Sequence, residues 1–202
     1  MSAQLSPIKQ VRKKNRKQEI IQISLELLQT HGYENFSYQD ISSALGITKA
    51  SIHYHFPKKE DLGQALCEAI KQWHEDLFRQ LRANDISAHE KLHAFVQALL
   101  SYAKGPNKVC PLSSLQADVA KLPMALLPTL QDLDRHELDF ISQVLEEGRQ
   151  NGEFSFPGDA NAQASIFVLS LKGALQYSRI HGGEWIAPVL QQLDQLLLAG
   201  DH

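Results

Sequence analysis

Residues 36–56 read FSYQDISSALGITKASIHYHF, and this stretch decides the fold of the chain. Ser37 is a good N-cap for a first short helix, and Asp40 three residues later completes an approximate capping box. Gly46 supplies the positive φ that a chain needs when it reverses directly after a helix. Because Thr48 can cap the next helix, the stretch predicts two short helices joined by a tight turn.

The two short helices are predicted to have distinct apolar and polar faces. The first places Ile41, Ala44 and Leu45 on one small apolar face, and the second turns Ile52 and Phe56 inward. The outward face of the second helix carries short polar, basic and aromatic residues: Lys49, Ala50, His53 and Tyr54. Such side chains suit base edges and phosphates rather than a protein core. The pattern is typical of a helix-turn-helix whose second helix enters the DNA major groove.

These residues resemble the TetR/AcrR family of bacterial transcriptional regulators. The resemblance covers roughly the first third of the chain, at the following positions: His31-Gly32-Tyr33, Phe36-Ser37, Asp40-Ile41, Leu45-Gly46-Ile47, His55-Phe56-Pro57, Lys59 and Leu62. Many matched positions in one order are more specific than an isolated helix-turn-helix pattern. The chain departs from the family at His53, where tyrosine is usual, and the neighbouring Tyr54 is the candidate to make that contact.

The resemblance implies two sets of DNA-contacting residues on a double-stranded, near-palindromic operator. The candidates for the sugar-phosphate backbone are Ser37, Tyr38, Thr48, His55 and Lys59. The candidates for base reading are Lys49, Ala50, Ser51, His53 and Tyr54. A lysine can donate to guanine O6 and N7, and an alanine can touch a thymine methyl group. For His55, a capping or core role is the competing interpretation.

Helical periodicity continues through the rest of the chain, which predicts an all-α fold. An apolar stripe at spacings of three and four predicts a long helix over residues 59–82, with a break at residues 84–87. Another helix is expected to reach about Tyr102, before a Gly105-Pro106-Asn107 loop. Three prolines then divide the middle of the chain into short pieces, ahead of a helix that ends near Gln150. The last two helices are expected at residues 159–180 and 185–199.

The resemblance and the periodicity together imply three parts. Residues 1–15 form a basic N-terminal arm, and residues 16–76 form a three-helix DNA-binding domain with its helix-turn-helix at about 37–56. Residues 77–202 form a helical ligand-binding and dimerisation domain, joined to the first domain through a long helix.

The charge of the chain is unevenly distributed. Residues 1–60 carry a formal charge of +4 and the remainder carries −7, which gives −3 for the whole chain. Six of the basic residues come before the first apolar periodicity: Lys9, Arg12, Lys13, Lys14, Arg16 and Lys17. A positive end on an acidic body fits a polyanionic partner at one end only. A solvated tail is the alternative, but the position just before a helix-turn-helix favours an arm that reaches the DNA backbone.

The first of the two C-terminal helices is apolar around most of its circumference over residues 166–175. A helix of this kind must be buried on nearly every side. An ordinary internal helix of one subunit is one interpretation. The resemblance implies the other, a homodimer in which the last two helices and their symmetry mates form a four-helix interface. Such a dimer would hold two recognition helices about one DNA turn, roughly 34–36 Å, apart.

In the TetR family a small molecule that binds among the C-terminal helices changes the separation of the DNA-reading helices. The resemblance therefore implies a small-molecule effector of unknown identity. Candidate pocket residues, for each of which core packing is the alternative, are Trp73, Phe78, Tyr102, Cys110, Leu115, Met124, Phe140, Phe167 and Tyr177. Cys110-Pro111-Leu112 resembles a segment of some family branches, a few of which sense electrophiles through cysteine. A thiol beside Lys108 would have a lowered pKa, which makes a thiol-responsive regulator the alternative to a buried structural cysteine.

One motif points to an enzyme. His89-Glu90-Lys91-Leu92-His93 matches H-E-x-x-H, in which two histidines clamp Zn²⁺ and the glutamate acts as general base. No third-ligand pattern follows His93, and a glutamate in a first helical turn is explained by the helix dipole. A di-iron site needs two Glu-x-x-His segments, and only Glu90-x-x-His93 fits. A zinc peptidase is thus a remote alternative, and we expect no catalytic residue, no metal and no cofactor.

The sequence also limits the compartment. No run approaches the roughly 18 apolar residues that a membrane span requires, so no membrane partner is expected. Cys67 and Cys110 are too few and too isolated for a disulfide framework. We therefore expect a cytoplasmic protein with both thiols reduced.

Overall fold

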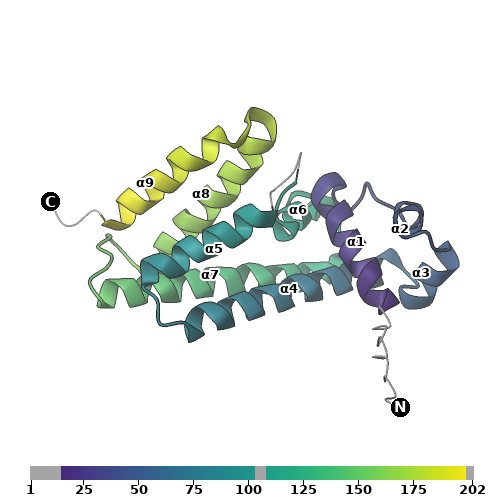
Figure 1. Cartoon of the computed structure of the whole chain (residues 1–202), viewed down its shortest axis with the longest axis horizontal. Helices are drawn as coiled ribbons and strands as arrows, with labels where there is room; N and C mark the ends of the chain where they lie inside the picture. The colour runs from purple at the N-terminus through teal and green to yellow at the C-terminus, as the bar shows by residue number, and fades with distance from the viewer. Residues whose placement is uncertain (1–14, 103–107, 199–202) are drawn as a thin grey trace, which may run out of the picture.

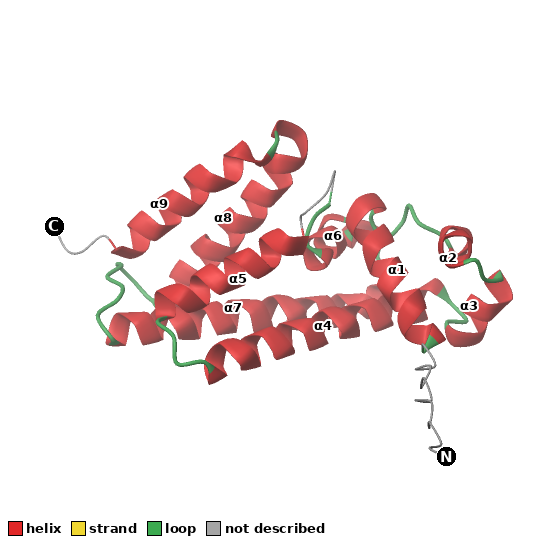
Figure 2. Cartoon of the chain, viewed as in Figure 1, coloured by secondary structure: helices red, strands yellow, loops and turns green. Residues whose placement is uncertain are grey.

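The computed structural model describes residues 15–102 and 108–198, and within these ranges the chain forms helices and no strand (Figure 2). The basic arm up to Lys14 and the Gly105-Pro106-Asn107 loop lie outside the described residues. The elements are α1 (Arg16–His31), α2 (Tyr38–Leu45), α3 (Lys49–His55), α4 (Lys59–Ala83), α5 (Ala88–Tyr102), α6 (Pro111–Ala117), η1 (Val119–Lys121), η2 (Met124–Leu126), α7 (Leu127–Gln150), α8 (Ala160–His181), η3 (Gly183–Trp185) and α9 (Ile186–Leu198).

The predicted all-α fold is therefore confirmed, and most predicted helix ends lie within a residue or two of the observed ones. α4 begins at the predicted Lys59 and ends one residue later than expected, at Ala83. Prolines mark helix starts in the middle of the chain, because Pro111 and Pro128 occupy the first turns of α6 and α7. None of the described helices is long and apolar enough to cross a membrane.

The helices form a small N-terminal unit and a longer body (Figure 1). α1, α2 and α3 pack together at one end, and α4 runs from them along the length of the body beside α7. α5 covers these two helices, while α8 packs on α7 and pairs with α9 at the far side. Three phenylalanine side chains are buried at the centre of the body. The rings of Phe78 and Phe140 are stacked with their centroids 3.9 Å apart, and the ring of Phe95 lies beside them.

The N-terminal unit is attached to the body through the C-terminal end of α1. The Ser114 hydroxyl of α6 donates to the Leu28 carbonyl at 2.6 Å in a buried hydrogen bond. The Gln29 side-chain amide donates to the carbonyl of Val109 at 3.0 Å, and the Tyr33 backbone N–H donates to the Asp118 carboxylate at 2.7 Å. Because these bonds join groups more than 75 residues apart in sequence, they fix the orientation of α1 relative to α6.

One face of α8 is exposed, so the expectation that this helix is buried on nearly every side stays a prediction. Within the single chain, Leu169 is 67% exposed and Ile180 is 82% exposed. The opposite face carries Phe167, Val168 and Leu171 into the core. The apolar circumference of α8 is therefore divided between a buried face and an exposed face.

Gly148 gives a direct test of the packing between α7 and α5. A Cβ at this position would overlap the ring of Phe154 and approach the Cβ of Ala88 to 2.9 Å. We expect Gly148→Ala to lower the free energy of unfolding by about 1–3 kcal/mol in urea denaturation, since overpacking outweighs the gain in helix propensity of roughly 1 kcal/mol. Asp139→Ala, at an exposed position of the same helix, should change stability by less than about 0.5 kcal/mol. Equal stabilities of the two variants would contradict the packing.

Candidate nucleic-acid interface

The first helix of the helix-turn-helix begins with the predicted capping box. The Ser37 hydroxyl accepts a hydrogen bond from the Gln39 N–H at 3.2 Å. The Asp40 carboxylate accepts from both the backbone N–H and the hydroxyl of Ser37, each at 2.7 Å. These bonds hold the pKa of the Asp40 carboxyl below its usual value. α2 therefore has a fixed start, set by residues within one turn of each other.

The turn between α2 and α3 has the predicted left-handed residue. Gly46 has φ 63° and ψ 36°, and its N–H donates to the Ser42 carbonyl. The Ser42 hydroxyl is buried and donates to the Ile47 carbonyl at 2.6 Å, which closes the turn from inside. The predicted apolar face of α2 needs a correction here, because Ala44 is exposed and Ser42 takes an inward position.

The recognition helix α3 has the orientation that the sequence predicts. Ile52 and Phe56 are 0% and 2% exposed, so they anchor the helix on the N-terminal unit. The Thr48 hydroxyl accepts the hydrogen bond of the Ser51 N–H at 3.2 Å and caps the helix. Ser51 is half-buried, whereas the other base-reading candidates are exposed: Lys49, Ala50, His53 and Tyr54. α3 thus presents polar, basic and aromatic groups to solvent from a backbone fixed at both ends.

The hydroxyl of Tyr38 is used inside the protein. It donates to the Phe56 carbonyl at 2.8 Å, and the Tyr38 ring makes an edge contact with the His53 ring at 4.8 Å. A phosphate accepts hydrogen bonds but does not donate them, so a contact with phosphate would require the hydroxyl hydrogen of Tyr38. That hydrogen is already donated to the Phe56 carbonyl. In this geometry Tyr38 positions the C-terminal end of α3, and the expected phosphate contact is not available to its hydroxyl hydrogen.

The side chain of Lys59 also forms hydrogen bonds within the protein. Its ammonium donates to the Phe36 carbonyl at 2.7 Å and to the Glu34 carbonyl at 3.3 Å, over the rings of Tyr33 and Phe36. Partial burial lowers the pKa of the Lys59 ammonium, and the carboxylates around it oppose that effect. Two of its three N–H donors therefore fasten the loop before α2 to the start of α4, and the expected role of Lys59 on phosphate stays a prediction.

The remaining phosphate candidates differ in what they can donate. Ser37 gives its hydroxyl hydrogen to Asp40, whereas Thr48 has no acceptor for its hydroxyl hydrogen among the described residues. His55 is half-buried and borders a groove of about 790 Å³ between α1 and α4, so it does not share the exposed face of His53. Sequence reasoning missed Lys58, which is exposed just after α3. Only the neighbouring Lys59 belongs to the family pattern, so the pattern gave no reason to select Lys58.

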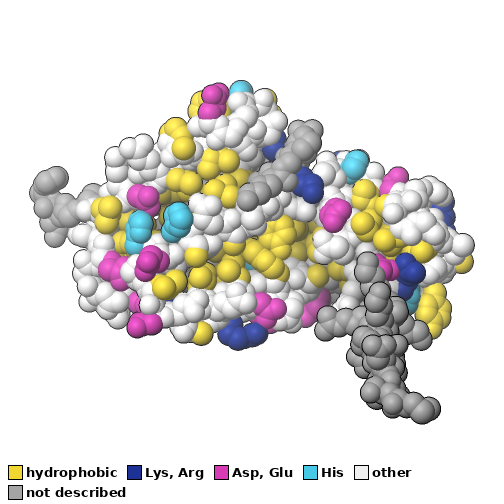
Figure 3. All heavy atoms as spheres, in the orientation of Figure 1, with side chains coloured by type: hydrophobic (Ala, Val, Ile, Leu, Met, Phe, Trp, Pro, Cys, Tyr) yellow, Lys and Arg dark blue, Asp and Glu magenta, His cyan; other side chains and the backbone are white. Residues whose placement is uncertain are grey.

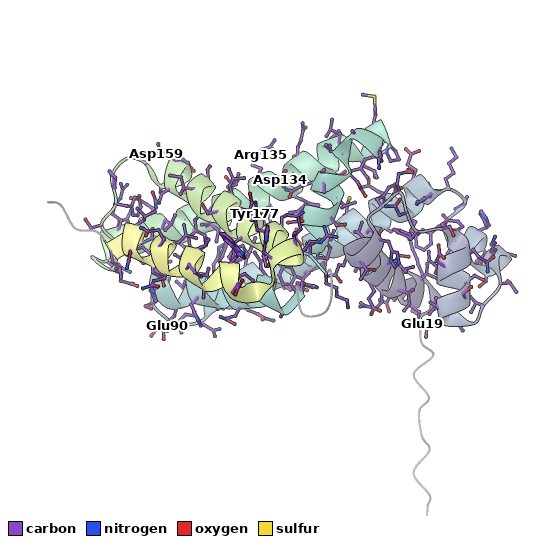
Figure 4. The ribbon with its side chains drawn as sticks, turned by 90° about the horizontal axis from the view of Figure 1, so that it is seen from above. Glu19, Glu90, Asp134, Arg135, Asp159 and Tyr177 are labelled. Carbon is purple, nitrogen blue, oxygen red and sulfur yellow. The ribbon has the colours of Figure 1, made fainter. Side chains whose placement is uncertain are left out.

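The candidate effector residues do not form one group. Five of them are core side chains with 2% exposure or less: Phe78, Cys110, Leu115, Phe140 and Phe167. Trp73 and Tyr102 are half-buried, with their rings in edge contact at 4.7 Å. Met124 is 86% exposed on η2, and Tyr177 is 58% exposed on α8 (Figure 4). Met124 and Tyr177 therefore lie at the surface of the described chain, apart from the core residues, and the effector pocket stays a prediction.

Cys110 lies in an environment opposite to the one expected. Its side chain is 2% exposed, and burial raises the pKa of the thiol, with a further increase from Glu137 that Lys172 partly opposes. The expected lowering beside Lys108 is wrong, because desolvation outweighs the nearby positive charge. A buried thiol with a raised pKa has little of the reactive thiolate form.

The H-E-x-x-H segment has local structural roles. The Glu90 carboxylate accepts from the Ser87 N–H at 2.9 Å and caps α5, which holds its pKa below the usual value. The Nε2 atom of His89 lies 3.7 Å from the Oδ1 atom of Asp194, and the exposed side chain of His93 lies beside Gln97. Within residues 15–102 and 108–198, no three His, Cys, Asp or Glu side chains are grouped as metal ligands. Nothing in this geometry supports the zinc peptidase alternative.

Known proteins share this architecture. The profile described as "Bacterial regulatory proteins, tetR family" matches residues 20–66, and the profile "Tetracyclin repressor-like, C-terminal domain" matches residues 88–186. The crystal structure of a TetR-family transcriptional regulator from Agrobacterium tumefaciens superposes with a TM-score of 0.85 at 30% identity, covering 91% of this chain and 98% of that chain. The transcriptional repressor NemR of Escherichia coli is 23% identical over 158 residues, which are 77% of this chain and 79% of that protein. The nucleoid occlusion factor SlmA of Idiomarina loihiensis is 22% identical over 166 residues, which are 81% and 83% of the two chains.

A capped helix-turn-helix on a larger helical body defines a class of DNA-binding regulators. Within this class, the chain belongs to the TetR family of bacterial transcriptional regulators, whose members bind DNA and act as dimers. The predicted domain boundary after residue 76 falls inside α4 and stays a prediction.

Lys49 tests whether the exposed face of α3 reads bases. We expect Lys49→Ala to weaken binding to the preferred operator by about 1–3 kcal/mol, because a donor to a base edge is lost, while binding to random duplex hardly changes. Titrations of both duplexes at one salt concentration measure the difference. Lys71→Ala removes an exposed lysine of α4, paired with Glu75 at 3.9 Å, and should leave both affinities unchanged. Equal losses on the two duplexes for Lys49→Ala would contradict base reading.

Proposed function

We propose that the protein is a transcriptional repressor that binds a near-palindromic operator as a homodimer and is released by a small-molecule effector. The observation that carries the proposal is α3, a short helix with a fixed backbone and an exposed polar, basic and aromatic face. Repression is the function in the name of the relative NemR. Within this proposal Lys49, Ala50, His53 and Tyr54 face the bases, with Ser51 at the margin of that face.

Thr48 and Lys58 are the side chains best placed to hold phosphates in this proposal. Thr48 caps α3 through its oxygen and can still donate its hydroxyl hydrogen. Lys58 is an exposed cation at the junction of α3 and α4. Contacts of this kind set the position of a protein on DNA and carry little sequence information. Base preference would therefore come from α3 and symmetry from the dimer.

An exposed apolar face on the last two helices supports a homodimer. Ile166, Leu169, Tyr177 and Ile180 recur along one side of α8 with exposed fractions of 48%, 67%, 58% and 82%. α9 adds Leu196 across a groove of about 450 Å³ between the two helices. Hydrophobic side chains gather over this part of the surface (Figure 3). A contiguous apolar patch of this kind typically marks a protein interface, and a second copy of the chain offers a matching one.

The attachment of α1 to α6 supports release by an effector. Ser114, Asp118 and the Gln29 side chain connect the end of α1 to residues in and around α6. α6 also contacts α4 and α7, so a shift among these body helices would move the N-terminal unit. An effector acts by binding the geometry that does not fit DNA more tightly than the geometry that does.

Selection of bound sites from random duplex DNA tests the function. We expect the full-length protein to enrich one near-palindromic sequence whose half-site centres are about one helical turn, roughly 34–36 Å, apart. Affinity for that sequence should fall steeply with salt, because bound cations release counterions from the phosphates. A compound screen for release from the selected operator then tests the effector. Enrichment of no sequence would overturn the proposal, and enrichment of an asymmetric site would overturn the dimeric reading of the operator.

Leu169→Arg tests the dimer. A guanidinium placed in an apolar interface loses its hydration without a partner, so we expect monomers in sedimentation analysis. Loss of the second recognition helix should weaken operator binding by about a hundredfold or more. Met124→Arg places the same side chain at an apolar position that is 86% exposed on η2, and it should remain dimeric. A dimeric Leu169→Arg protein would contradict the proposed interface.

A further inference from the structure

A group of polar side chains lies inside the body, away from both the recognition helix and the exposed face of α8. We name it the buried polar centre. Its members are Glu137 of α7 and Lys172 of α8, which form an ion pair, His74 of α4 beside Lys172, and Ser113 of α6, one helical turn from Cys110, whose thiol is within electrostatic reach of that pair. The exposed fractions of Glu137, Lys172, His74 and Ser113 are 0%, 9%, 0% and 5%. Four helices that are separate in sequence thus each contribute one polar group to the interior.

The charges of the buried polar centre compensate one another. The Lys172 ammonium lies 2.5 Å from the Glu137 carboxylate, so the pair is neutral as a unit. Burial raises the pKa of the Glu137 carboxyl, and Lys172 opposes that effect. Burial lowers the pKa of the His74 imidazole to about 3, with Lys172 and His136 acting in the same direction, so the ring is neutral.

Several hydrogen-bonding atoms of the centre have no hydrogen-bond partner among the side chains and backbone that the structure describes. They are both ring nitrogens of His74, the Ser113 hydroxyl and the Glu137 carboxylate oxygen that does not face Lys172. A buried polar group without a partner retains its full desolvation penalty, and native proteins satisfy most such groups. A buried ion pair is also weak support for stability, since apolar side chains of similar volume often replace one without loss. The centre is therefore better explained by recognition than by folding.

We infer that the buried polar centre binds the head group of a neutral small molecule that both donates and accepts hydrogen bonds, such as a primary amide. The free Glu137 oxygen accepts a ligand N–H, and the Ser113 hydroxyl donates to a ligand carbonyl. The stacked rings of Phe78 and Phe140, with His74 parallel to Phe78, offer an apolar surface beside the head group. This inference rests on the proposed effector function of the body.

A charged head group fits the centre less well. Glu137 and Lys172 already neutralise each other, so an anion or a cation would enter the interior without a counter-charge. The desolvation of such an ion would then be uncompensated. A wholly apolar ligand would leave the unpartnered groups as they are.

The centre is also connected to the N-terminal unit. Ser113 belongs to the centre, and the adjacent Ser114 donates to the Leu28 carbonyl of α1 at 2.6 Å. Cys110, at the start of the same helix, is within electrostatic reach of both Glu137 and Lys172. A head group that draws Ser113 toward Glu137 therefore acts on the helix that holds α1.

Four compounds with one phenyl ring test the head group on the full-length protein: benzamide, benzoate, benzylamine and toluene. We expect benzamide alone to raise the melting temperature at millimolar concentration and to bind in calorimetry, with a Kd of about 1 mM as suits a fragment of this size. Tighter binding of benzoate or benzylamine would overturn the neutral class. Preference for toluene, or binding of none of the four, would overturn polar recognition at this centre.

A double variant locates the binding. Glu137→Leu with Lys172→Met removes the buried pair at similar volume, and we expect it to fold and to lose benzamide binding by tenfold or more. Lys71→Met with Glu75→Leu removes an exposed ion pair of α4 and should bind benzamide as the unmodified protein does. Ser113→Ala removes one hydroxyl and should weaken benzamide binding severalfold. If the double variant does not fold, this single variant tests whether benzamide binds at the centre. Unchanged binding in the folded double variant, or in Ser113→Ala, would overturn the assignment.

The same samples separate this inference from the proposed function. Operator binding is measured with and without benzamide for the unmodified protein. Benzamide that binds at the centre without weakening operator affinity would contradict effector release and leave the head-group assignment intact. Specific operator binding with no benzamide binding would contradict the head-group assignment and leave the DNA-binding function intact.

Discussion

The buried hydrogen bond from the Ser114 hydroxyl to the Leu28 carbonyl is the constraint on which the rest of the structure depends. The Leu28 carbonyl already accepts the Gly32 N–H at 3.0 Å at the end of α1, and the Ser114 hydroxyl is a second donor that comes from a distant part of the chain. α6 thus holds the end of α1, and Asp118 just after α6 accepts the Tyr33 N–H. The N-terminal unit is therefore attached to the body through α6 as well as through α4. Its angle to the body is set by a short helix that also borders the buried polar centre.

Sequence reasoning succeeded where the chemistry is local. The capping box of Ser37 and Asp40, the left-handed Gly46 and the cap at Thr48 involve partners within five residues. Each is decided by backbone geometry that depends on few neighbours, so the pattern of side chains determines it. The inward Ile52 and Phe56 follow from helical periodicity alone, and with them the outward face of α3.

It failed where a partner comes from another part of the chain. Nothing near Tyr38 in sequence indicates that its hydroxyl binds the Phe56 carbonyl, and Lys59 finds its acceptors at residues 34 and 36. Lys108, two residues from Cys110, suggests a lowered thiol pKa, whereas burial of the side chain raises it. His74, Glu137 and Lys172 come from three different helices, so their meeting could not be read from spacing.

α8 explains why one sequence pattern supported two interpretations. Phe167 and Leu171 face the core of the chain, Lys172 reaches the buried polar centre, and Leu169 and Tyr177 face outward. A helix between an internal core and a second apolar surface has no side that needs to be polar, so it shows little amphipathicity. Within this chain α8 has one buried face and one exposed apolar face, and the surface that covers the exposed face stays a prediction. Under the proposed function, a change in the buried polar centre and a change in the proposed dimer contact would act on different faces of α8, which would give ligand binding a short route to the spacing of the two recognition helices.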